Sequence, residues 1–234
     1  MPELTPTLIA ELASLDTPTV CNALEVVAPE RRGYGYTTQP LVCTRPALKP
    51  IVAVARTASI RAAHPSELRG AQAREASVAY YRYIDAGPKP SVVVIADLDG
   101  AQRGYGSWWG EVNSNIHKGM GCTGVITDGS VRDIPDIAAG FAMLADRIGP
   151  SHAFVHVVNF AQSVTVAGMQ VCDGDLVHAD QHGAVVIPWA VAHQVKAAAD
   201  LIARKERVII RAAQQPGFNM ERLEMAWGES AEIH

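Results

Sequence analysis

The 234-residue sequence has no cluster of basic side chains, and its formal net charge at pH 7 is −4. Proteins that bind nucleic acid through its phosphates need a concentrated patch of lysine and arginine. We therefore predict no nucleic-acid partner. The sequence also has no apolar run close to the ~20 residues that a membrane-spanning helix needs. We predict no membrane partner either.

Three further features are missing. The N-terminus, MPELTPTLIAEL, lacks the basic flank and apolar run of a signal peptide. The four cysteines are scattered without a C-x-x-C pair, which disfavours a zinc site or a disulfide framework and favours reduced thiols in a cytoplasmic protein. No glycine-rich loop of the G-x-G-x-x-G kind follows a predicted strand, so a nucleotide-binding loop is not expected.

What the sequence does contain is typical of a soluble globular protein, with 48% hydrophobic and 19% charged residues. We find no internal repeat, low-complexity segment or long linker. We therefore predict a single domain, 1–234. It would carry an N-terminal helical segment over 1–30 and a C-terminal helical segment over 189–234, which includes a long amphipathic helix.

Buried strands are expected at 51–61, 91–98, 122–127 and 141–147. The run SVVVIADL at 91–98 is almost wholly apolar, as in a strand that is covered on both faces. Asp97 and Asp99 stand at its end, where ligand sites are common in α/β folds, but the sequence assigns them no role. Two alternating runs at 152–160 and 163–171 are typical of strands in a second, antiparallel sheet.

The stretch from Gly110 to Ile137 holds the most informative pattern. Trp108, Val112, Ile116 and Met120 recur every four residues and predict a helix that begins near Gly110. The free N–H groups of a first helical turn favour a carboxylate or phosphate ligand. Gly110 has no Cβ, so a ligand could approach its backbone closely.

The second half of this stretch predicts a strand, a turn at Asp128-Gly129, and a new helix. Asp133 stands where the N-cap of that helix would be, with Pro135 just inside and Asp136 three residues on. Taken singly, Asp133 is best explained as a cap, and Arg132 and Glu111 as solvated surface residues. Their combination with glycine-rich surroundings suggests instead an acid, a guanidinium and a second acid that converge.

Three segments together resemble a known family. They are GE followed by a helix, GCTGVITDGSVRD, and GDLVHADQHGAVVIP. They are similar to the family named for regulator of ribonuclease activity A. That family includes class II pyruvate aldolases acting on 4-hydroxy-4-methyl-2-oxoglutarate and 4-carboxy-4-hydroxy-2-oxoadipate. The resemblance extends from about residue 17 to about Pro188. It implies an α/β fold, a layered β/β/α (swivelling-domain-like) sandwich with N-terminal helices and a long C-terminal helix.

The resemblance also implies a chemistry. Asp133 would bind Mg²⁺ or Mn²⁺ directly, Glu111 would hold it through water, and Asp136 is a possible further ligand. The backbone at Gly110, Val112 and Asn113 would bind the carboxylate of a small 2-oxo acid. Arg132 would face its keto oxygen, and a base held by Glu111 would take the hydroxyl proton.

The expected activity is a metal-dependent carbon–carbon lyase, either a pyruvate-releasing aldolase or an oxaloacetate decarboxylase. The family further implies a homo-oligomer, a trimer or hexamer. Two departures concern the substrate: Glu111 stands where the aldolases usually have Asp, and polar residues follow Val112 where they usually have aliphatic ones.

Alternatives remain open. The family name suggests a non-catalytic protein that binds and inhibits a ribonuclease. The polar insertion of Asn113, Asn115 and His117 suggests a different hydroxylated substrate. A rival metal cluster is formed by His178, Asp180 and His182, which alternate along one strand face, although the last lies at a predicted hairpin tip.

Overall fold

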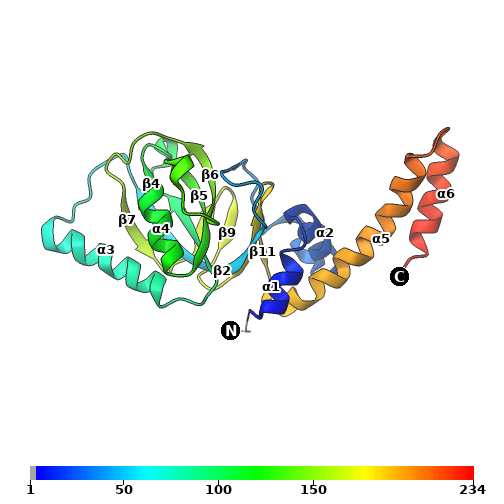
Figure 1. Ribbon diagram of the computed structural model, residues 1–234, viewed down its shortest axis with the longest axis horizontal. Coiled ribbons are helices and arrows are strands. Elements are labelled where there is room, and N and C mark those ends of the chain that lie inside the picture. The colour runs from blue at the N-terminus through cyan, green and yellow to red at the C-terminus, as the bar shows by residue number, and fades with distance from the viewer. Residues whose placement is uncertain (1–3) are drawn as a thin grey trace.

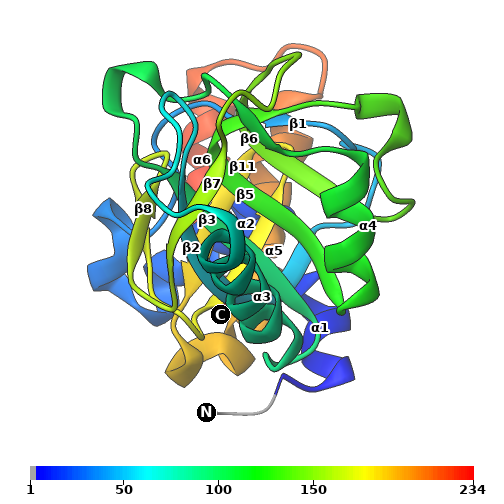
Figure 2. The same cartoon turned by 90° about the vertical axis from the view of Figure 1, so that its left-hand side faces the viewer.

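The computed structural model describes residues 4–234. A layered α/β body carries a pair of C-terminal helices that extends away from it (Figure 1). Seen end-on, helix α3 (Gly70–Asp85) crosses in front of the sheet (Figure 2). The remaining α-helices are α1 (Pro6–Leu12), α2 (Thr17–Val27), α4 (Glu111–Gly119), α5 (Val195–Ala213) and α6 (Met220–Ala231). Short 3₁₀ turns are η1 (Pro29–Gly33), η2 (Gly100–Gln102), η3 (Ile134–Asp136) and η4 (Trp189–Gln194).

One mixed sheet of nine strands forms the centre of the body. Its strands are β1 (Val42–Cys43), β2 (Ile51–Arg61), β3 (Ser91–Asp97), β4 (Ser107–Trp109), β5 (Cys122–Val131), β6 (Ala142–Ile148), β7 (His156–Phe160), β10 (Leu176–Asp180) and β11 (Gly183–Ile187). The order is β1-β6-β5-β3-β2-β10-β11, with β4 paired to β5 and β7 to β2. Strands β2 to β6 run parallel, so their carboxyl ends meet at one edge, where ligand sites are common.

Both faces of this sheet are covered. One face packs under the hairpin of β8 (Val164–Val166) and β9 (Met169–Val171), and the other packs under α3 and α4. This arrangement confirms the predicted β/β/α sandwich and explains why β3 is buried along its whole length. The second β layer is smaller than expected, because β7 joins the main sheet through antiparallel pairing with β2.

The N-terminal helices pack with the start of α5 against β10 and β11, as a third apolar cluster. Thr5 caps α1 and Asp16 caps α2 through their side chains. Helix α6 continues through Gly228 and ends at Ala231. Within residues 4–234, no helix is long and apolar enough to cross a bilayer.

Three predictions for the central stretch are wrong. Asp128-Gly129 does not form a turn, because β5 continues through it to Val131 with an irregular register against β6. No α-helix follows Asp133, but only the single turn η3. The buried face of α4 also differs from the predicted stripe: Ser114 and His117 are buried, whereas Val112 is 68% exposed.

Candidate active site

The pairing of β4 with β5 creates the candidate site. Trp109 pairs with Val131, and the Arg132 N–H donates to the Trp109 carbonyl at 2.9 Å. Helix α4 begins directly after β4, and the segment after β5 continues into Arg132 and Asp133. The first turn of α4 and the Arg-Asp pair therefore lie side by side, although twenty residues (112–131) separate Glu111 from Arg132.

Asp133 is the residue that joins the two segments. Its backbone is left-handed, with φ of 54°, a conformation that Asp adopts more readily than most residues. Its Oδ2 accepts the N–H of Glu111 at 3.2 Å and lies 3.5 Å from Nε of Arg132. Asp133 thus caps α4 and not the turn that follows it, which corrects the predicted local cap.

Gly110 is required at this point by the close approach of that carboxylate. A Cβ on Gly110 would lie 2.4 Å from Oδ2 of Asp133, well inside van der Waals contact. The φ of Gly110 is −166°, so its role is to leave space rather than to permit an unusual backbone. The structure therefore places the backbone of Gly110 and Glu111 beside the side chains of Arg132 and Asp133, on an open surface. Their joint role as a site stays a prediction.

The first turn of α4 keeps two donors free. Among the described residues, the N–H groups of Val112 and Asn113 have no hydrogen-bond acceptor. The helix is nine residues long, and its N-terminal amides carry partial positive charge. The substrate-binding backbone predicted at these positions is therefore available for a carboxylate, while its role remains a prediction.

The polar insertion after Val112 serves the fold. The Tyr81 hydroxyl donates to Oδ1 of Asn113 at 2.7 Å, and Nδ2 of Asn113 donates to the Trp108 carbonyl at 2.7 Å. Nδ2 of Asn115 donates to the Glu111 carbonyl of the same helix at 2.9 Å. These contacts give both side-chain amides a structural role in positioning α4.

The His117 side chain lies on the buried face of α4. Its Nε2 lies 2.9 Å from the Tyr80 hydroxyl, and its Nδ1 lies 2.7 Å from the Asn113 carbonyl. Burial lowers the pKa of His117 to about 4, which the Asn113 carbonyl only partly offsets, so the ring is neutral near pH 7. Trp109 is fully buried between His117 and Phe141 and is a core residue, not a wall of a substrate pocket.

The acids at the site form a sparse ligand set. Among residues 4–234, no three His, Cys, Asp or Glu side chains are grouped so as to hold a metal ion, so no three-ligand shell that includes Asp136 is formed. Mg²⁺ typically keeps several waters and takes only one or two protein carboxylates. Asp133, with Glu111 acting through water, fits such a cation in donor type and number.

The His178 and Asp180 side chains of the rival cluster on β10 make structural hydrogen bonds. His178 is fully buried: Nδ1 lies 3.0 Å from the Thr17 hydroxyl, and Nε2 lies 3.2 Å and 3.1 Å from the carbonyls of Leu12 and Leu15. Burial lowers its pKa, so the neutral ring locks the N-terminal helices onto the sheet. Asp180 accepts the N–H groups of Thr17 and His182.

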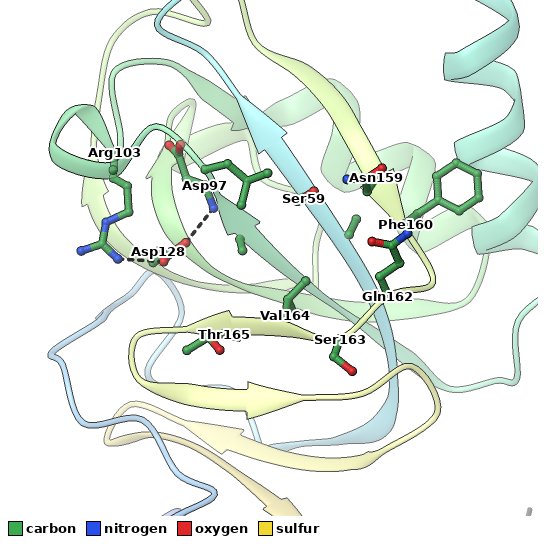
Figure 3. Close-up of a pocket in the computed structure, with 14 residues that line it drawn as sticks. Ser59, Asp97, Arg103, Asp128, Asn159, Phe160, Gln162, Ser163, Val164 and Thr165 are labelled. Carbon is green, nitrogen blue, oxygen red and sulfur yellow. Dashed lines mark hydrogen bonds and ion pairs between the residues drawn. The ribbon is translucent and has the colours of Figure 1, made fainter.

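The sequence did not identify a cavity at the carboxyl edge of the sheet. It has a volume of about 530 Å³ and lies beside the carboxyl ends of β2 and β3, lined by Ser59, Asp97, Arg103, Asp128 and Asn159 among others (Figure 3). The position of Asp97 at the end of an apolar strand was the available signal. None of the four residues that converge at α4 lines this cavity.

The fold and site define a layered α/β protein with a polar site between a helix start and the edge of a parallel sheet. The chain belongs to the RraA-like family: the family model described as Aldolase/RraA matches residues 17–186. This family contains both aldolases and ribonuclease inhibitors. Comparison with curated proteins gave no significant match.

Solved structures share this fold at low sequence identity. A protein of Pseudomonas syringae pv. tomato is 23% identical, with a TM-score of 0.71 over 96% of this chain and 95% of its own. RraAS2 of Streptomyces coelicolor, described as an unusual member of the RNase ES inhibitor RraA family, is 20% identical, with a TM-score of 0.67 over 88% and 97%. At these identities the likeness establishes the fold alone.

Proposed function

We propose that the protein is a divalent-metal-dependent lyase that cleaves a 4-hydroxy-2-oxo acid and releases pyruvate, or decarboxylates oxaloacetate by the same chemistry. The observation that supports this proposal is the convergence of the α4 start with Arg132 and Asp133. An anion-binding backbone, a guanidinium and a carboxylate are then within reach of one small molecule.

In this proposal the free N–H groups of Val112 and Asn113 bind the carboxylate of the substrate. Arg132 donates to the keto oxygen, where negative charge develops when the C3–C4 bond of the substrate breaks. Asp133 holds the Arg132 side chain and the Glu111 N–H in place at the same time. Glu111 supplies the carboxylate that would hold a water as the base for the C4 hydroxyl proton.

Asp133 and Glu111 would hold Mg²⁺ or Mn²⁺, which when bound supplies Lewis-acid stabilisation of the negative charge on the keto oxygen. The donors are all oxygens, which suits either cation. The side chains of Arg132 and Asp133 are 33% and 39% exposed, so the site is open on the single chain. We propose that neighbouring copies in a homotrimer or homohexamer cover it.

The test is a coupled assay of pyruvate release over 4-hydroxy-4-methyl-2-oxoglutarate, 4-carboxy-4-hydroxy-2-oxoadipate and oxaloacetate. Each substrate is measured with Mg²⁺, with Mn²⁺ and with a chelator. We expect release with a cation and none with the chelator. Absence of pyruvate from every substrate under both metals would refute the lyase assignment.

A second candidate follows from RraAS2, whose description names an inhibitor of RNase ES. This protein would then bind a ribonuclease and inhibit it without chemistry of its own. The two proposals differ in the effect of Arg132→Ala. A lyase loses pyruvate release, whereas an inhibitor that does not use this site keeps its inhibition of RNA cleavage.

A further inference from the structure

The cavity beside β2 and β3 has features of a second ligand site. At about 530 Å³ it is within the range of ~300–1,000 Å³ typical of small-molecule sites. Its walls come from the ends of β2, β3 and β7, from β5, and from the segment leading into β8 (Figure 3). The segments meet there because β7 pairs with β2 and the β8–β9 hairpin covers the same face of the sheet.

Polar groups in this cavity have no partner in the protein. Ser59 is only 5% exposed and lines the cavity, yet its hydroxyl makes no hydrogen bond with any described residue. Asn159 lies directly across from Ser59 in the β2–β7 pairing, and its side-chain amide is likewise unpaired within residues 4–234. Gln162 adds a second unpaired amide on the same wall. Asn159 and Gln162 are exposed and the Ser59 hydroxyl faces the open cavity, so water solvates these groups until a ligand with hydrogen-bonding groups of its own replaces it.

The charged groups of the cavity indicate which ligands are disfavoured. The guanidinium of Arg103 is paired with Oδ2 of Asp128 at 2.9 Å, and Oδ1 of Asp128 accepts the Asp97 N–H at 2.8 Å. Asp97 accepts the N–H groups of Asp99 and Gly104, and each of its carboxylate oxygens keeps a further lone pair. Burial raises the pKa of Asp97, consistent with a carboxyl group in need of hydrogen-bond donors. An anionic 2-oxo acid would meet two carboxylates and no free cation among the lining residues.

The remaining chemistry matches a molecule with many hydroxyl groups. Side-chain amides both donate to and accept from hydroxyls, and a carboxylate accepts from them. Leu98, Phe160 and Val164 supply apolar wall for carbon-bound hydrogens. We propose that this cavity binds a small neutral polyhydroxylated molecule, a sugar or sugar alcohol, through Ser59, Asn159, Gln162 and Asp97.

The experiment uses the full chain and four probes: D-glucose, D-xylose, myo-inositol and D-sorbitol. Saturation-transfer NMR and calorimetry measure binding, and the side-chain amide signals of Asn159 and Gln162 report its location. We expect at least one probe to bind saturably and to shift both signals. Asn159→Ala and Ser59→Ala should each weaken binding by roughly fivefold, the effect of one net hydrogen bond. Asn22→Ala, which removes an exposed asparagine on α2, is the matched control and should bind as the unaltered protein does.

Four outcomes would overturn the proposal. The first is that none of the four probes binds saturably, and the second is that Asn159→Ala leaves their binding unchanged. The third is that pyruvate or putrescine, instead of the polyols, binds in a way that depends on Asn159. The fourth is that Asn159→Arg, which fills the cavity, changes the oligomeric state of the protein in solution. The last outcome would identify the cavity as an interface between copies. Because the proposed lyase chemistry uses residues outside the cavity, the lyase assay and this experiment can fail independently.

Discussion

Two polar clusters, one at the start of α4 and one on β10, differ in how their hydrogen bonds are used. At the α4 start, Asp133 and Arg132 are partly exposed, and two backbone N–H groups remain free. On β10, His178 is fully buried, and both of its ring nitrogens face partners on the N-terminal helices. Both clusters were metal-site candidates by residue type.

The difference shows that residue type alone does not separate a site from a structural anchor. In the β10 cluster the chain itself supplies partners for both ring nitrogens of His178, so this imidazole keeps no capacity for a ligand. In the α4 cluster the chain holds the residues in position but leaves donors and acceptors unused. The comparison predicts that changes at the first cluster affect chemistry and that changes at the second affect stability.

The largest expected effect is that of Arg132→Ala on pyruvate release. Removing a donor aimed at a developing oxyanion typically lowers kcat by a factor of about 10²–10³. Stability should hardly change, because the side chain is one-third exposed. Steady-state kinetics and urea unfolding measure the two effects. The control Arg69→Ala removes an exposed arginine whose side chain donates a hydrogen bond to the neighbouring Leu68 carbonyl, and it should leave the rate unaltered.

The next effect concerns stability, through His178→Leu. The substitution leaves the Thr17 hydroxyl and two carbonyls without their partner, so the free energy of unfolding should fall by about 3 kcal/mol. The folded protein should keep its kcat/KM. Urea unfolding with parallel kinetics tests this, and His193→Leu, at an exposed position, is the control. A loss of activity without a loss of stability would reverse the assignment of the two clusters.

A pH-dependent loss of stability should trace to His117. Its pKa is about 4 in the folded protein, whereas a solvated histidine in the unfolded chain has a pKa of about 6.5, so the unfolded chain binds more protons between these values. Stability is therefore fully present above about pH 6.5 and falls with acidification, by roughly 2 kcal/mol at about pH 5. His117→Gln should remove this part of the pH dependence. Urea unfolding of the unaltered protein and of His117→Gln is measured near pH 7.5 and near pH 5. An equal loss of unfolding free energy in the two proteins would contradict the prediction.

The smallest effect comes from two glycines of the same region. In Gly110→Ala the new Cβ would displace the Asp133 carboxylate, so kcat/KM should fall by roughly tenfold. In Gly119→Ala, at the other end of α4, the Cβ meets open space, and activity should not change. Equal kinetics in the two variants would show that the position of Asp133 does not matter for the reaction.

Strand periodicity is a local signal, and it predicted most of the strands. The layers were implied by the family resemblance and not by any local pattern. The sequence did not predict that β5 continues through Asp128-Gly129. There Asp128 is fixed by Arg103 and by the Asp97 N–H, contacts that outweigh the turn preference of the Asp-Gly pair. It also missed the buried face of α4, since Ser114 and His117 are buried only because Ala138 and Tyr80 supply distant partners.

The helical pair at the C-terminus has a consequence for how the molecule loses its structure. Helix α5 is buried only at Val195, Ala198 and Ala199 near its start, and α6 contributes only Ala226 and Ser230 to buried surface. The pair then leads away from the body (Figure 1). Few contacts couple its outer turns to the sheet, so these turns can open and close while the sheet stays intact. Amide hydrogens there will exchange with solvent first, and a protease will reach this part of the chain before any other helix.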